Sequence, residues 1–245
     1  MEADGRPAKR SGSPWTYLVM GCGVAVVLAL VGIAVLTYLG YRGAKQVETN
    51  FKDPKAREAS VRKVVPYRQL PAGYYPAGAI SIPFFMDFAI FTDREPAPGQ
   101  TPEQGNFDQR SFIYMNMRHL KDNKEKMERY LRGEAPAPED SAWKQSNVNF
   151  DEKELIRRGA VKVEDREILF AAHRGEISRK GQRTEGIVTM VMPECPNDNR
   201  MRFGVWITPD PQSAKPLAEA DYAGTGADPA GISEFLGHFE LCGGK

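Results

Sequence analysis

Three side chains near the carboxyl end of the chain could form a metal site or a catalytic thiol site. His238 and Cys242 are four residues apart, which would place them on one face of the last expected helix, and Cys195 offers a third ligand. Zinc prefers thiolate and imidazole, but it also needs a fourth ligand or an open water position. Cys195 could otherwise act as a nucleophile with His173 or His238 as its base. An envelope enzyme or metal-binding protein that uses Cys195, His238 and Cys242 is therefore one hypothesis.

The same two cysteines have a second interpretation, as a disulfide. Cys195 lies in the turn-rich stretch 193–199 and Cys242 lies near the end of the sequence, so neither belongs to an apolar stripe. They are the only cysteines outside an apolar run near the amino terminus, and one pair is compatible with a disulfide in an oxidising compartment. We favour this interpretation. A disulfide would leave no thiolate for catalysis or metal binding.

A cluster of basic residues could bind an anion or a lipid headgroup. It consists of Arg174, Arg179, Lys180 and Arg183. Guanidinium and ammonium groups are common partners of phosphate. The alternative interpretation, which we favour, is a solvated hairpin end.

An apolar binding edge is a further possibility. Phe84, Phe85, Met86 and Phe88 follow one another closely in a stretch with β character. A core strand explains these residues equally well, so both interpretations stay open.

No motif of a known enzyme class accompanies these candidates. The chain has no phosphate-binding glycine loop, no His-Glu-x-x-His, no Gly-x-Ser-x-Gly and no Cys-x-x-Cys. Of 33 basic and 32 acidic residues, three basic and two acidic ones precede the apolar run, which leaves 30 of each sign after it. A neutral domain has no electrostatic reason to bind nucleic acid. We therefore predict a non-catalytic domain with no cofactor, no resident metal and no nucleic-acid partner.

An α+β domain is expected to position the candidate residues, over residues 66–245. In 201–208 the residues Met201, Phe203, Val205 and Ile207 alternate onto one face, which is typical of a half-buried antiparallel strand. The other stretches with β character are 74–82, 84–91, 167–173 and 186–192, and the last of these is expected to pair with 201–208. Residues 112–117 could be a strand or the start of a helix.

Two helices are expected to cover this antiparallel sheet. The first lies around 120–132 and ends before Gly133. The second begins near Asp228, which can cap it, with Pro229 at the first helical position.

Residues 15–41 are predicted to form a transmembrane helix. They carry no charged side chain and exceed the roughly 20 residues that a helix needs to cross a bilayer core. A cleaved signal peptide would have a shorter apolar region, and a lipoprotein signal at Cys22 is disfavoured by the bulky Met20. Residues 1–14 form a short tail, and residues 42–65 are expected to be a charged, partly helical juxtamembrane linker.

The orientation of this helix in the membrane is judged from flanking charges and from the cysteines, and its partners from small residues within it. Lys and Arg lie on both sides of the span, so the expected disulfide is the better argument for an extracytoplasmic domain. Gly21, Ala25 and Ala29 recur every four residues and could allow self-association of the helix. We predict a single-pass membrane protein, anchored by residues 15–41, whose domain binds or assembles with other envelope proteins.

Overall fold

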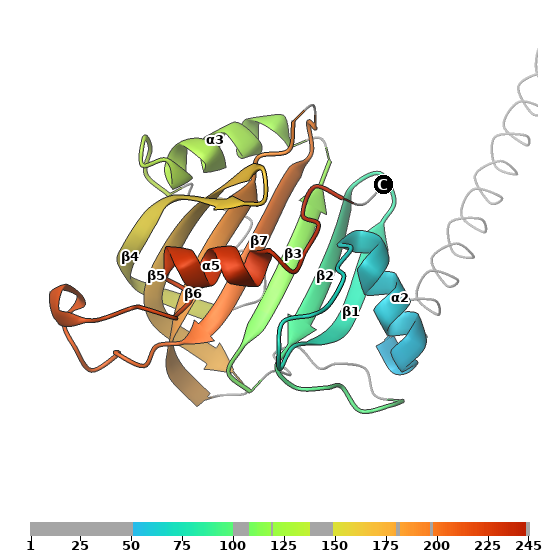
Figure 1. Ribbon diagram of the computed structural model, residues 1–245, viewed down its shortest axis with the longest axis horizontal. Coiled ribbons are helices and arrows are strands. Elements are labelled where there is room, and N and C mark those ends of the chain that lie inside the picture. Colours follow the sequence, from blue (N-terminus) through green and yellow to red (C-terminus); the bar gives the residue numbers. More distant parts are fainter. Residues whose placement is uncertain are drawn as a thin grey trace, which may run out of the picture. The chain divides into compact units, whose positions relative to one another are not determined.

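Seven antiparallel strands form one sheet, in the spatial order β1-β2-β3-β7-β6-β5-β4 (Figure 1). The strands are β1 (Tyr75–Ile82), β2 (Met86–Thr92), β3 (Ser111–Met117), β4 (Asn149–Val163), β5 (Arg166–Arg179), β6 (Gln182–Pro193) and β7 (Met201–Pro209). Strand β7 pairs with both β3 and β6, so it joins the first three strands to the long β4-β5-β6 meander. The predicted α+β class and antiparallel sheet are confirmed for this domain.

The computed structural model describes part of the chain, and every described residue belongs to one compact unit, Val47–Lys245. The described residues are 51–99, 108–118, 120–137, 149–179, 182–196 and 198–243. The predicted transmembrane helix, residues 15–41, lies outside them, as do the tail 1–14 and residues 42–50. Within the described ranges, no helix is both long and apolar enough to cross a membrane.

Each face of the sheet carries its own apolar core. On one face, helix α5 (Pro229–Leu236) packs Phe235 against Trp206, with ring centroids 4.1 Å apart. On the other face, helix α3 (Lys121–Leu131) buries Met127 and Leu131 together with Phe203. The predicted alternation in β7 is confirmed, because Met201, Phe203, Val205 and Ile207 all lie in the core beneath α3.

Helix α2 (Pro54–Val64) occupies the region where a charged linker was expected. Asp53 caps it, Pro54 takes the first position, and Val61 and Val64 are buried with the core beneath α5. Arg57 is 2% exposed and donates hydrogen bonds to backbone carbonyls, among them that of Pro96. The folded domain therefore begins before residue 66. The many charged residues of α2 obscured its narrow apolar stripe in the sequence. The hydrogen bonds of Arg57 allow this side chain to be buried.

The remaining expected elements are present, with two differences. Helix α3 and the Asp228 cap of α5 are confirmed, and a short 3-10 helix, η1 (Leu217–Glu219), precedes α5. The paired strands β5 and β6 extend beyond the expected 167–173 and 186–192, to Arg179 and from Gln182. Strand β4 was not anticipated, because as an edge strand paired only with β5 it can carry many charged residues.

Candidate functional site

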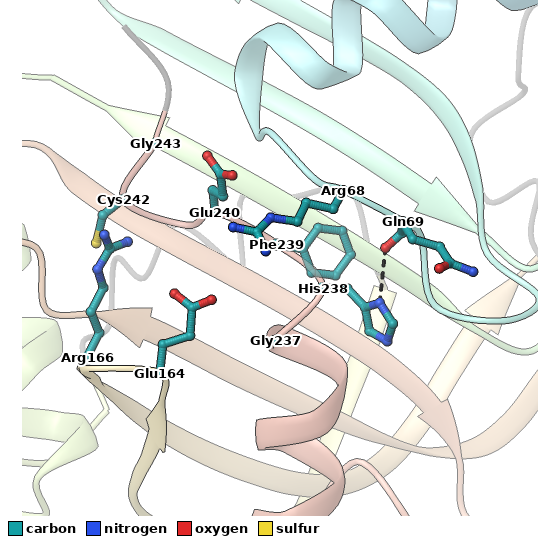
Figure 2. A pocket seen from close by; sticks show the side chains of 10 residues that line it. All are labelled: Arg68, Gln69, Glu164, Arg166, Gly237, His238, Phe239, Glu240, Cys242 and Gly243. Carbon is teal, nitrogen blue, oxygen red and sulfur yellow. Dashed lines mark hydrogen bonds between the residues drawn. The ribbon is translucent and has the colours of Figure 1, made fainter.

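An open cleft of about 290 Å³ lies where three segments of the domain meet (Figure 2). Arg68 and Gln69 come from the segment after α2, Glu164 comes from the turn between β4 and β5, and Arg166 is the first residue of β5. The third segment, Gly237–Gly243, follows α5. Its backbone is joined to the first segment, because the Glu240 amide donates to the Pro66 carbonyl at 2.8 Å.

Arg202 on β7 holds the carboxyl-terminal segment from beneath. Its side chain is 1% exposed, and its Nη1 donates to the carbonyls of Leu241 at 3.0 Å and Gly243 at 2.6 Å. The hydroxyl of Tyr114 also donates to the Leu241 carbonyl. Because a guanidinium group is a rigid planar fork of donors, these contacts fix the backbone that forms one edge of the cleft.

Asp198 balances the charge of Arg202 and completes this support. The two side chains form an ion pair at 2.8 Å, and Arg200 donates to the same carboxylate. Burial by itself would raise the pKa of Asp198, but the hydrogen bonds from Arg200 and Arg202 outweigh it and hold the pKa well below its usual range. Asp198 is therefore ionised at every physiological pH.

Cys242 on the cleft wall is paired with Cys195. The sulfur atoms lie 1.98 Å apart and the Cα atoms 5.6 Å apart, as in a disulfide, so the predicted pairing agrees with the structure. A disulfide ties the cleft edge to the segment after β6 and leaves neither sulfur as a thiolate. In the described part of the chain, no group of three or more His, Cys, Asp or Glu residues could hold a metal ion.

His238 lies in the same cleft but differs from the expected arrangement. Helix α5 ends at Leu236, so His238 and Cys242 do not share a helical face, and Figure 2 shows them at opposite ends of the cleft. The His238 Nδ1 lies 3.0 Å from the Gln69 carbonyl. Because a carbonyl only accepts, Nδ1 carries the proton and a neutral ring offers Nε2 as an acceptor.

The charged side chains along the cleft are balanced. Arg68 and Arg166 contribute two positive charges, and Glu164 and Glu240 contribute two negative charges. The sulfur of Cys242 is bonded, so the lining offers donors and acceptors of hydrogen bonds but no activated nucleophile. This chemistry suits recognition of a polar group that carries both charges, or of a peptide backbone.

The residues of the predicted anion or lipid-headgroup site have different surroundings. Arg174 is buried and donates to Asp210 at 2.7 Å and to the carbonyls of Gln212 and Lys215. Arg183 is 73% exposed and lies 3.6 Å from Glu176. Lys180 and the side chain of Arg179 lie outside the described residues. Arg174 thus holds the segment after β7, and the anion site stays a prediction.

A buried polar cluster beneath α3 was not anticipated from the sequence. His173 on β5 places Nε2 2.6 Å from the Tyr130 hydroxyl and Nδ1 2.8 Å from the Glu152 carboxylate. Burial lowers the pKa of His173, although Glu152 opposes this effect, and burial raises the pKa of Tyr130 to about 12. The cluster joins α3, β4 and β5, and no local motif could reveal it because Tyr130 and His173 are 43 residues apart.

The predicted apolar edge divides into a buried and an exposed part. Met86 and Phe88 are partly buried and pack against the core beneath α3. In the β1–β2 turn, by contrast, Phe84 is 84% exposed, Phe85 51% and Ile82 44%. Phe84 also has φ +65°, a left-handed conformation that costs a non-glycine residue about 1–2 kcal/mol.

No protein-family model matches the chain, and no curated protein is significantly similar to it in sequence. The geometry of the described residues therefore carries the functional argument alone.

Proposed function

We propose that this protein is a single-pass membrane protein whose extracytoplasmic domain binds a polar partner through the cleft and catalyses no reaction. The observation that carries the proposal is the cleft itself. Its edge is held by Arg202 and by the Cys195–Cys242 pair, and its lining presents balanced charges without a nucleophile. A preformed, hydrogen-bonded edge suits binding, because little ordering is needed when a partner arrives.

Two further observations support the location. The apolar run 15–41 has the length and composition of a membrane span. A disulfide pair is typical of a domain on the oxidising side of a membrane. The alternative function, an enzyme or metal protein that uses Cys195, His238 and Cys242, would require the disulfide to be reduced.

The location can be tested with a membrane-impermeant maleimide on intact cells or spheroplasts. The experiment uses the Cys22→Ser variant, because this substitution removes the thiol in the predicted span. We expect labelling of Cys195 and Cys242 only after reduction. Labelling without reduction would revive the thiol and metal hypotheses, and labelling only after permeabilisation would place the domain in the cytoplasm.

Binding at the cleft can be tested by photo-crosslinking in living cells. A photoreactive residue replaces Arg68 in the cleft or, as a matched control, the exposed Lys126 on α3. We expect a discrete adduct from position 68 alone, and we expect Arg166→Glu to abolish it. Adducts that are the same at both positions, or that survive Arg166→Glu, would contradict binding at the cleft.

A further inference from the structure

We propose that the β1–β2 turn, residues 82–85, inserts its apolar side chains into the surface of the bilayer that holds the predicted span. This inference rests on the membrane anchoring proposed above. The turn contains three of the four exposed large apolar side chains of the described residues. Phe84, Phe85 and Ile82 lie within four consecutive residues and offer no side-chain hydrogen-bonding group.

The exposure of Phe84 is held in place by the backbone around it. The Phe85 amide donates to the Ile82 carbonyl at 3.1 Å and closes the turn. The Arg118 amide donates to the Phe85 carbonyl at 2.9 Å, which attaches the turn to the end of β3. A strained residue that projects a large apolar ring into water brings no benefit to the folding of this domain, and such strain is often kept for a function.

The size and chemistry of the turn favour a lipid surface over a protein partner. A standard protein interface takes about 800 Å² from each partner, which is far more than four residues of one turn can supply. Large apolar side chains such as Phe bury readily at the boundary between headgroups and acyl chains, where insertion does not need a complementary pocket. The Arg118 side chain at the base of the turn is paired with Asp87 at 2.7 Å, so attraction to anionic headgroups contributes little.

The chain geometry allows the turn to reach the membrane. The predicted span ends at Tyr41, and ten residues later the Phe51 ring fills the space beside Gly78 where a Cβ would lie. Ten residues can extend over about 35 Å. Phe84 follows Gly78 by six residues, or about 20 Å along the strand direction. The tether is therefore long enough for the turn to touch the same bilayer surface.

The test uses the full chain in phosphatidylcholine vesicles with brominated acyl chains. Phe84→Trp places a fluorescent probe in the turn, and Tyr75→Trp is the matched control at the opposite end of β1, where Tyr75 is 38% exposed. Emission is compared with that of the unsubstituted chain. We expect the added emission of Phe84→Trp to shift to shorter wavelength and to lose most of its intensity in brominated vesicles. The emission added by Tyr75→Trp should be unquenched.

Two variations make the result specific. Adding Phe85→Ser to Phe84→Trp should reduce the quenching, and high salt should leave it unchanged because the contact is apolar. Emission from Phe84→Trp that is neither shifted nor quenched would overturn the proposal. The turn would then be expected to contact a protein partner instead. Quenching that requires anionic lipid and disappears in salt would also overturn it.

Failure of the anchor can be told apart from failure of the turn. If alkaline carbonate extracts the full chain from the vesicles, the proposed membrane anchoring is wrong. If the chain resists extraction but Phe84→Trp is not quenched, only the inference about the turn is wrong.

Discussion

The carboxyl-terminal edge of the cleft and the β1–β2 turn both lie at the surface, but different interactions hold them. At the cleft edge, the carbonyls of Leu241 and Gly243 accept hydrogen bonds from the buried Arg202, and a disulfide pair adds a further link. In the turn, Phe84 is 84% exposed and in a left-handed conformation. The comparison indicates that the cleft edge contributes to the stability of the fold, whereas the exposed rings of the turn do not.

The largest expected effect tests the support of the cleft edge. Arg202→Leu leaves the carboxylate of Asp198 without its buried partner and removes the donors to Leu241 and Gly243. We expect the free energy of unfolding to fall by about 3–5 kcal/mol. Denaturant unfolding of the full chain in detergent micelles measures this change.

A matched control for Arg202 is the exposed Arg94. Its ion pair with Asp108 leaves the two side chains 60% and 67% exposed, so Arg94→Leu should cost less than about 1 kcal/mol. Equal losses for the two variants would mean that the cleft edge is no more important for stability than an ordinary surface.

Removal of the disulfide should have the next largest effect. Cys195 and Cys242 are 47 residues apart, and a crosslink that closes a loop of this length restricts the unfolded chain. We expect the double variant Cys195→Ser, Cys242→Ser to lose about 2–4 kcal/mol in the same unfolding assay. An unchanged unfolding midpoint after reduction of the native chain would show that the pair is not bonded in the protein.

The buried His173 should make the stability of the domain depend on pH. His173 is 2% exposed and its pKa is lowered by burial, so the fold prefers its neutral form. Stability from this residue is complete above its unfolded pKa of about 6.5 and is lost as the pH falls below that value. Each unit between the folded and unfolded pKa corresponds to about 1.4 kcal/mol.

Thermal unfolding between pH 5 and about pH 8 measures this dependence, a range that spans the ordinary histidine pKa. His173→Gln should flatten the curve, and a slope that stays the same in this variant would contradict the assignment to His173.

The smallest expected effect has the opposite sign. Phe84→Gly relieves the left-handed conformation but makes the unfolded chain more flexible, so we expect a change between zero and about 1 kcal/mol towards greater stability. A loss of more than about 1 kcal/mol on unfolding would show that Phe84 supports the fold, which would remove the contrast with the cleft edge.

Local patterns predicted much of the domain. The alternation in 201–208 and the Asp228-Pro229 start of a helix are signals carried by a few neighbouring residues, and both agree with the structure. The packing of helix α2 into the domain and the existence of strand β4 were missed for a common reason. Each carries many charges on its exposed side, and only contact with the sheet shows which residues are buried.

The candidate site depended on contacts between residues that are far apart in the sequence. The sequence by itself brought Cys195 and Cys242 forward as a pair, because two cysteines in a domain allow only one pairing. The sequence also predicted a membrane span at 15–41 and a possible apolar binding edge that includes the aromatic residues 84 and 85. Only the tertiary structure decided that Arg202 would meet the carbonyl of Leu241, or that Tyr130, His173 and Glu152 would form one cluster. Periodicity and capping act over a few neighbouring residues, whereas these contacts depend on how the fold brings distant elements together. Strand β7, which carries Arg202, lies between β3 and β6, and β4 pairs with β5.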